Sequence, residues 1–335
     1  MTSSPKREPG VFARPVALVL LALLALVWGA HWTVVKVGLQ YMPPFTYGVL
    51  RLVGGILTIV AILGYQRRLR LPPRGDLSIV VSVGVLQVAA GIVLMNFALR
   101  IVPAGRSSVL AFSTPLWVAL LMWAVFRKSP RKVELLGVAL GICGIIALLN
   151  PAAIDLGIPL EVVGTLALVL QAVLWAVVTL HIRHHTWHAS ALDLQPWILG
   201  AALVPVAISA LLFEQGRTID WQPATVLILL YSGPLATAFA NWASQSITRS
   251  LGSIAATTGF LATPVVGLAT ASIFLHEPLT LIDLVGFGLV LGGIAAASLT
   301  APAKVAATDA PVSDGTEASG PMEAPDPDVA VARMP

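Results

Sequence analysis

Long apolar segments recur along the whole chain, and they restrict its fold more than any other feature. A helix that crosses the hydrocarbon core of a bilayer needs about 20 mostly apolar residues. Ten such segments can be read from the sequence, and the connections between them are too short for a soluble domain. The segments are Pro15–Val37, Phe45–Tyr65, Leu77–Leu99, Ser107–Phe126, Val133–Leu149, Leu160–His181, Leu192–Phe213, Ala224–Ile247, Ile254–Leu275 and Leu281–Leu299. Their continuous apolar character excludes the alternating pattern of transmembrane β-strands.

The composition agrees with a membrane protein. Hydrophobic residues make up 57% of the 335 residues and charged residues only 11%, whereas soluble domains carry about 25% charged residues. So few charges cannot cover the surface of a soluble fold, and so many apolar residues exclude a disordered chain. The single cysteine, Cys143, excludes an internal disulfide framework and a cysteine-clustered zinc site. We therefore predict an all-α polytopic membrane protein.

The basic residues indicate an orientation. With the N-terminus placed inside, fifteen of the 20 Lys and Arg residues fall in inner segments and four fall in outer ones. Short cytoplasmic loops carry an excess of Lys and Arg, so we predict that both termini are cytoplasmic and that the protein lies in the inner (plasma) membrane. The surplus of basic charge suits anchoring to anionic lipids and not binding of nucleic acid.

The ten segments divide into two similar halves. Matching residues lie at nearly one offset: Thr114-Pro115 and Thr263-Pro264, Gly137 and Gly286, and Gly144 and Gly293 are 149 apart, while Trp28 and Trp175, and Lys36 and Arg183, are 147 apart. Each half holds five spans, and because five is odd, the second half must enter the membrane from the opposite side. An inverted repeat places a substrate site near the midplane and allows two states that open to either side. This pattern predicts a transporter.

These observations define four parts of the chain. We expect a cytosolic segment over residues 1–14, a first five-helix repeat over 15–149 and a second five-helix repeat over 150–299. Residues 300–335 are rich in Ala, Pro and acidic residues and have almost no large apolar ones. Such a composition cannot offset the entropy of ordering by burial, so we expect a disordered cytosolic tail.

Several motifs resemble those of a known family. The stretch Trp28-Gly29…Lys36…Pro43-Pro44…Arg51 resembles the opening signature of the EamA family, in the drug/metabolite transporter superfamily. A proline in the fourth and ninth segments and the run Leu275-His276-Glu277-Pro278-Leu279 are also similar to that family. The resemblance covers residues 15–299. It implies ten helices and the export of amino acids and related metabolites, or the movement of other small solutes.

Polar and aromatic side chains inside the spans are the candidates for a substrate cavity. Trp28 and His31 lie on one helix face and suit an amphiphilic or aromatic solute. The alternatives are an aromatic belt at the membrane interface and hydrogen bonding between helices. The candidates are Trp28, His31, Gln87, Gln171, Trp175, Tyr231, Asn241 and Gln245.

Charged residues and prolines add further candidates. Lys36 and Arg51 are candidate charge clamps for a substrate carboxylate, because ionisable residues at membrane depth are costly and often functional. Snorkelling of the charged group to the interface is the alternative for both. Pro115 and Pro264 each remove a helix hydrogen bond. They are candidate gate hinges, or else static kinks.

The sequence lacks the motifs of several classes of enzyme. It has no phosphate-binding loop for ATP and no metalloprotease or serine-hydrolase motif, so we expect no enzyme activity, no cofactor and no metal. The histidines His181, His184, His185 and His188 have only Asp193 nearby in the sequence, and we interpret them as a solvated basic loop. No Asp or Glu lies deep in any span, which favours facilitated or exchange transport, with His31 as the only proton-binding alternative within a span.

Together these points predict a secondary transporter. We expect it to export a small amphiphilic metabolite, such as an amino acid, by alternating access around a central cavity. An importer or a broad-specificity drug or metabolite carrier remains open. A membrane enzyme or a sensor without transport is the rival of another class. The expected partners are a small-molecule substrate and the lipid bilayer, with the chain as a monomer or homodimer.

Overall fold

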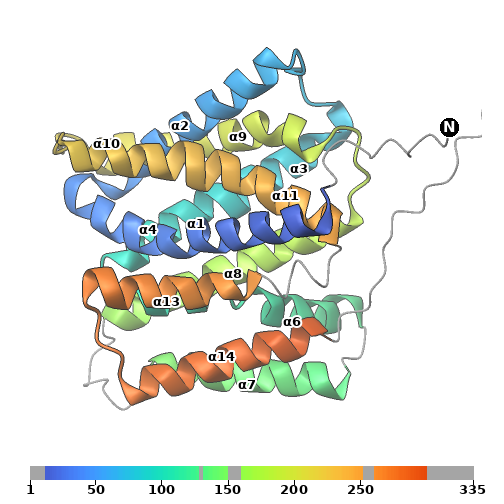
Figure 1. Ribbon diagram of the computed structural model, residues 1–335, viewed down its shortest axis with the longest axis vertical. Coiled ribbons are helices and arrows are strands. Elements are labelled where there is room, and N and C mark those ends of the chain that lie inside the picture. Colours follow the sequence, from blue (N-terminus) through green and yellow to red (C-terminus); the bar gives the residue numbers. More distant parts are fainter. Residues whose placement is uncertain (1–11, 128–130, 150–159, 252–259, 300–335) are drawn as a thin grey trace, which may run out of the picture. The chain divides into compact units, whose positions relative to one another are not determined.

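The computed structural model describes residues 12–127, 131–149, 160–251 and 260–299, and all regular structure within these ranges is helical. The expected tail at 300–335 and most of the expected N-terminal segment lie outside the described residues. In the first half the helices are α1 (Arg14–Tyr41), α2 (Pro44–Tyr65), η1 (Arg74–Asp76), α3 (Leu77–Val81), η2 (Ser82–Ala89), α4 (Ala90–Leu99), α5 (Ala104–Ala111), α6 (Thr114–Phe126) and α7 (Lys132–Leu149). In the second half they are α8 (Leu160–His184), α9 (Ala191–Phe213), α10 (Pro223–Leu230), η4 (Tyr231–Phe239), α11 (Ala240–Leu251), α13 (Ala262–Leu275) and α14 (Leu281–Leu299). Figure 1 shows this arrangement.

Seven stretches of the described chain are long and apolar enough to cross a membrane, fewer than the ten segments predicted. They are Arg14–Tyr41, Pro44–Tyr65, Arg74–Leu99, Ala104–Val125, Leu160–Ile182, Ala191–Phe213 and Pro223–Ser244. The other three expected segments correspond to α7, α13 and α14, which are helices of 18, 14 and 19 residues. The expected ninth segment begins at Ile254, and its first residues lie outside the described ranges. The all-helical prediction is thus confirmed, but the length of α13 falls short of a full span.

The candidate hinge prolines both lie just after a helix break. The expected fourth segment is interrupted at Phe112–Ser113, between α5 and α6, and Pro115 occupies the first turn of α6. In the second half Leu261 forms a turn and Pro264 follows in the first turn of α13. A proline has no N–H and clashes with the carbonyl four residues before it, so the helix is interrupted ahead of each one.

The two halves share unusual backbone features at the offset of 149 residues. The third span of each half contains a π-helix, η2 from Ser82 and η4 from Tyr231. Helices α6 and α13 both end at a residue in the left-handed region, Arg127 with φ 51° and His276 with φ 53°. Because the same rare conformations recur at matched positions, the two halves have the same local fold.

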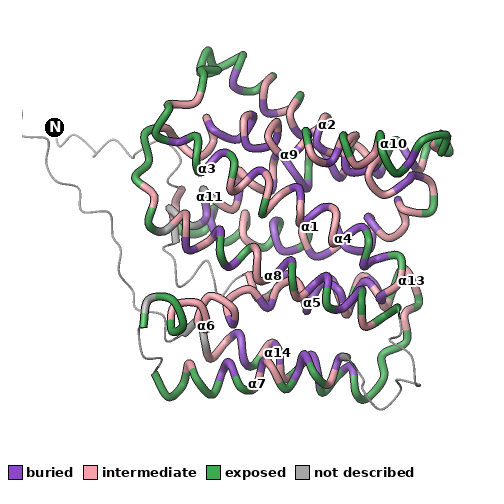
Figure 2. The backbone as a smooth tube through the Cα atoms, turned by 180° about the vertical axis from the view of Figure 1, so that it is seen from behind, coloured by how far each residue is buried: buried purple, intermediate pink, exposed green. Residues whose placement is uncertain are grey.

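Apolar side chains cover the outside of the helices. Leu57, Leu211, Phe274 and Leu281 are more than 60% exposed, and many other large apolar residues are exposed as well. Figure 2 shows exposed residues along the outer sides of α7 and α14 and buried residues where helices meet. A soluble fold would hide such side chains, whereas lipid tails solvate them.

Glycines allow helices of the two halves to pack closely against each other. A Cβ at Gly84 in η2 would lie 2.6 Å from the Ile198 carbonyl oxygen of α9, and one at Gly233 in η4 would lie 3.1 Å from the Arg51 carbonyl oxygen of α2. The π-helix of each half therefore packs directly on the second helix of the other half. We call these two places the crossed contacts. Small residues permit such close approach of helix backbones in a membrane.

A second glycine seam joins α7 and α14, which lie side by side in Figure 1. A Cβ at Gly144 would lie 2.8 Å from the Gly286 carbonyl oxygen, and one at Gly293 would lie 2.5 Å from the Gly137 carbonyl oxygen. The last helix of each half thus packs against its counterpart.

Candidate functional site

A group of buried and partly buried polar side chains lies where α1, α2 and η4 meet. It consists of His31 from α1, Tyr47 and Arg51 from α2, and Ser232, Tyr231 and Thr237 from η4, and we call it the core polar cluster. Helix η4 packs against both α1 and α2. A π-helix widens one turn of the backbone and is frequent at functional sites. Here it turns three polar side chains of one segment toward two other helices.

His31 is buried without a hydrogen-bond partner. Its residue is 5% exposed, and neither ring nitrogen has a partner in the described part of the chain. The imidazole stacks on the ring of Tyr231, with centroids 6.0 Å apart and planes 21° from parallel. The Tyr231 hydroxyl donates to the Val27 carbonyl oxygen at 2.5 Å. Since an unpaired buried polar group costs free energy, His31 is prepared for a hydrogen bond that the described part of the chain does not supply.

Arg51 is a cation without an acidic partner. Its Nε donates to Thr237 Oγ1 at 3.0 Å, and no ion pair joins its guanidinium to an acid in the described ranges. Arg51 is close enough to His31 and Tyr47 to interact with both electrostatically. A charge at membrane depth is expensive unless it is paired or faces a water-filled cavity. Arg51 is therefore the strongest candidate for binding an anionic group.

Hydrogen bonds hold the rest of the cluster in place. The hydroxyls of Tyr47 and Ser232 lie 2.6 Å apart, and the Thr237 hydroxyl donates to the Ser232 carbonyl oxygen at 2.7 Å. Asn241 Nδ2 donates to the Thr237 carbonyl oxygen at 2.6 Å, and Trp28 Nε1 donates to the Ala236 carbonyl oxygen at 3.1 Å. Trp28 and Asn241 thus lie beside the cluster, but their donors are used by the backbone of η4.

Among the residues that the structure describes, two predicted cavity residues, Gln87 and Gln171, are not bonded to the core polar cluster. Gln87 lies in η2 and Gln171 in α8, and the Oε1 atom of each is buried without a partner in the described chain. The amide nitrogen of Gln171 lies beside Gly91, 3.7 Å from where a Cβ would be. Neither side chain is hydrogen bonded to the core polar cluster within the residues that the structure describes. The structure therefore divides the candidate cavity residues into two groups.

Two of the predicted cavity residues are not placed at a buried site. Trp175 is 37% exposed, although it is spaced four residues from the buried Gln171. Spacing of four residues predicts a shared face but not which part of an apolar helix is covered. The side chain of Gln245 lies outside the described residues.

Lys36 forms an ion pair and does not snorkel freely. Its Nζ lies 2.9 Å from Glu277 Oε1 and also donates to the Val102 carbonyl oxygen at 3.1 Å. The Glu277 carboxylate also accepts the backbone N–H groups of Ala104 at 2.8 Å and Gly105 at 3.1 Å, at the start of α5. The first and second halves are therefore joined at this end of the helices, which we call the Lys36 face.

A second ion pair on the Lys36 face was not singled out from the sequence. Arg106 NH2 lies 2.8 Å from Asp283 Oδ1, and the Asp283 carboxylate also accepts the Thr280 hydroxyl at 2.6 Å. The sequence offers one signal for such a pair, an acid in the first turn of an apolar helix. It does not reveal the basic partner, which is 177 residues away.

The histidine-rich connection after α8 is not the solvated loop that was predicted. The side chain of His185 is 7% exposed, and it lies 2.9 Å from a fully buried carboxylate, that of Asp76. His188 contacts the same carboxylate at 3.1 Å. Asp193, the acid nearest in the sequence, pairs with Arg68 at 2.9 Å instead. Asp76 comes from the connection between α2 and α3, so the sequence around the histidines does not indicate it.

Comparison with known proteins identifies the family. The sequence profile of the EamA-like transporter family matches residues 15–150 and again residues 162–299. The uncharacterized transporter YvbV of Bacillus subtilis is 26% identical over 86% of this chain and 93% of its own. Proteins named probable amino-acid metabolite efflux pump are similar too, at 27% identity in Salmonella typhimurium and 25% in Escherichia coli, each over 82% of this chain and 92% of its own.

A solved structure supports the fold. One crystal structure matches with a TM-score of 0.57 at 19% identity and covers 86% of this chain and 98% of that chain. The two matches of the family profile correspond to the two repeats expected from the spacing of residues. The chain is therefore a multi-pass membrane transporter, not an enzyme, and belongs to the EamA-like transporter family.

Proposed function

We propose that the protein exports a small amphiphilic metabolite, such as an amino acid, across the inner membrane by alternating access. The observation that carries the proposal is Arg51, a partly buried cation that has a hydroxyl partner but no acid among the described residues. A substrate carboxylate bound there would neutralise the guanidinium. His31, whose ring nitrogens are unpaired, would supply a further hydrogen bond. The aromatic rings of Trp28 and Tyr231 would contact the apolar part of the substrate.

Contacts between connections support ten spans in two inverted repeats, and the excess of Lys and Arg in the inner connections supports cytoplasmic termini. The connections that follow α2 and α8 meet at Asp76. In the ten-span arrangement the chain crosses the membrane four times between these connections, so both lie on the same side. The ends of α1, α4 and α13 meet at Lys36, Val102 and Glu277. With the N-terminus inside, the Lys36 face is extracytoplasmic, and the connections that meet at Asp76 are cytoplasmic. Pro115 and Pro264, just after helix breaks, would act as hinges when one face opens.

Substrate counterflow in proteoliposomes tests the proposal. Vesicles loaded with a mixed amino-acid pool are mixed with radiolabelled amino acids outside, and saturable exchange of one class is expected. The variant Arg51→Gln should lose most of this exchange, because it removes the charged hydrogen bond between the guanidinium and the substrate carboxylate. Such a hydrogen bond contributes about 1.5–3 kcal/mol to binding. This corresponds to roughly a 10- to 150-fold weaker interaction.

The controls separate a binding role from a folding role. Arg51→Lys keeps the charge and should retain part of the exchange, while Arg100→Gln, at the C-terminal end of α4 where the residue is exposed, should leave exchange unchanged. Each variant is used only if it elutes as a single species in detergent. Exchange of no amino acid by the unmodified protein, or full exchange by Arg51→Gln, would contradict the proposed substrate class.

A further inference from the structure

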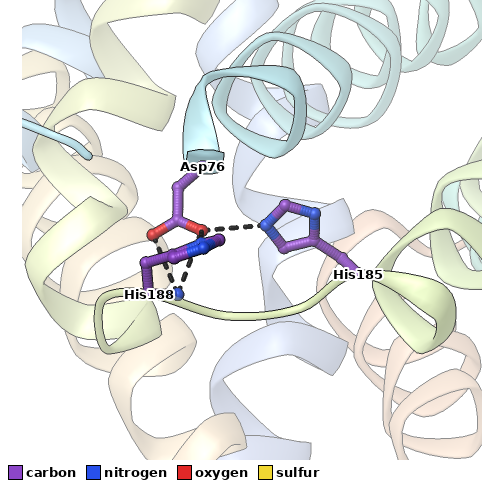
Figure 3. A group of neighbouring side chains, drawn as sticks. All are labelled: Asp76, His185 and His188. Atoms are coloured by element: carbon purple, nitrogen blue, oxygen red, sulfur yellow. Dashed lines mark hydrogen bonds and ion pairs between the residues drawn. The ribbon is translucent and has the colours of Figure 1, made fainter. Parts of the chain in front are cut away.

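A second cluster of side chains lies away from the core polar cluster and takes no part in the proposed transport site. Asp76 ends η1, and His185 and His188 lie in the connection between α8 and α9. Figure 3 shows the two imidazoles directed at one carboxylate. We propose that these three residues, the Asp76 site, bind a divalent transition-metal ion of the Zn²⁺ class.

The distances suit a small ion. His185 Nε2 and His188 Nδ1 lie 2.9 Å and 3.1 Å from Asp76 Oδ1, and the three ligand atoms lie within 4.8 Å of one another. Zinc binds nitrogen and carboxylate oxygen at about 2.0–2.2 Å, so neighbouring ligands of a tetrahedral site are about 3.3 Å apart. Insertion of the ion requires each imidazole nitrogen to move a few tenths of an ångström away from Asp76 Oδ1, with the two nitrogens, now within 4.8 Å of each other, also about 3.3 Å apart.

The carboxylate is oriented by the backbone. Asp76 is fully buried, and its Oδ2 accepts the N–H group of Ala189 at 2.8 Å, while the His188 N–H group is shared between Oδ1 at 3.2 Å and Oδ2 at 3.3 Å. Such second contacts fix a ligand and increase metal affinity. The other oxygen, Oδ1, is the one that faces both imidazoles.

Both rings are also held in place. A Cβ at Gly75 would lie 2.5 Å from His188 Cε1 and 2.8 Å from its Nδ1, so the absence of a side chain at Gly75 makes room for this imidazole. The ring of His185 packs edge-on against Trp187 at 5.4 Å and near His181 at 5.9 Å. The ligands are therefore positioned before an ion arrives.

One side of the site is open. The side chain of His188 is 52% exposed, and it lines a pocket of about 460 Å³ together with Arg68, Ser190 and Asp193. An ion can enter from this pocket, and a water molecule can occupy the fourth coordination position. Three protein ligands and an open position are typical of zinc sites that exchange a ligand.

The donor set selects the class of ion. Two imidazoles and one carboxylate suit Zn²⁺ and its neighbours in the first transition row, whereas Ca²⁺ and Mg²⁺ prefer oxygen ligands throughout. Asp76 belongs to the first half of the chain and both histidines to the second. A bound ion would therefore cross-link the halves on this face, and under the proposed function, on which this last consequence rests, it would hold the cytoplasmic side closed.

Zinc titration of the full-length protein in detergent tests the site without reference to transport. The protein is purified without a polyhistidine tag, and Zn²⁺ binding is followed by calorimetry, with Co²⁺ as an optical probe of tetrahedral coordination. The unmodified protein should bind one equivalent. His185→Gln and His188→Gln should each weaken binding at least about 10-fold, because loss of even an outer contact typically costs 10- to 100-fold.

A matched control and a second variant make the result decisive. His184→Gln changes an exposed histidine at the C-terminal end of α8 and should leave binding unchanged. Gly75→Ala keeps every ligand but displaces the His188 ring, and it should weaken binding as well. No saturable binding by the unmodified protein, equal binding by His188→Gln, or equal losses in His184→Gln and His188→Gln would overturn the proposal.

Discussion

At the scale of single residues, Glu277 joins three separate parts of the chain through one carboxylate. It pairs with Lys36 and accepts two backbone N–H groups at the start of α5. An acid at a helix N-terminus interacts favourably with the helix dipole and with the free N–H groups there. Its loss leaves Lys36 without its counter-ion and two backbone donors without their acceptor.

We expect Glu277→Gln to destabilise the protein. Loss of a charged hydrogen-bond acceptor at such a site costs about 1–3 kcal/mol, so the melting temperature in detergent should fall by several degrees. The control is Glu134→Gln, because Glu134 accepts one exposed N–H group, that of Arg131 at 3.0 Å. Equal melting temperatures of the two variants would contradict a stabilising role for Glu277.

Several site residues could be selected from the sequence, but their partners could not. Arg51, Lys36 and His31 are ionisable residues in otherwise apolar segments, and this is visible in the sequence alone. The partner of Arg51 is 186 residues away and that of Lys36 is 241 residues away. The exposure of Trp175 could not be predicted for a related reason, because α8 is apolar on most sides and spacing does not indicate which side is covered.

At the scale of helices, the π-helices η2 and η4 determine what the third span of each half contacts. Gly84 lies where the backbone of η2 touches α9, and Gly233 lies where η4 touches α2. The sequence predicts the two spans and the repeat offset. It does not predict π-helices, since Gly and Pro within an apolar run are equally compatible with a straight or a kinked membrane helix.

We expect Gly84→Ala to destabilise the protein, although it adds only one methyl group. The new Cβ would lie 2.6 Å from a backbone oxygen, which no side-chain rotation can relieve, so α9 and η2 must separate. The melting temperature and counterflow activity should both decrease. In the control Gly200→Ala, the new methyl group meets nothing within 4 Å, and alanine is the better helix former, so stability should be unchanged or higher. Equal stability of both variants would contradict the crossed contact at Gly84.

At the scale of the whole molecule, the acids that the structure describes lie at helix ends and in connections. Among the described residues, Glu134, Glu161, Asp193 and Asp283 lie in the first turns of helices, and Glu277 follows the end of α13. Proton-coupled carriers commonly use a carboxylate within the membrane. This distribution therefore favours exchange that does not depend on protons.

Counterflow should thus proceed at the same rate with and without an imposed pH gradient. The measurement compares initial exchange rates in vesicles with equal pH on both sides and in vesicles with an inward or outward gradient. Strict dependence on the gradient would contradict this prediction. His31 would then be the residue to replace, because it is buried in α1 without a hydrogen-bond partner in the described chain.

The crossed contacts have a consequence for how the chain is made. Helix η2 is synthesised more than a hundred residues before its partner segment in α9, and at about 5–20 residues per second the delay is of the order of 10 s. During that time the first five helices stand in the bilayer with the Gly84 surface covered only by lipid or by the insertion machinery. The contact of Gly84 with α9 can therefore form only after the second half has been synthesised. The last step of assembly is then the packing of two inserted halves against each other.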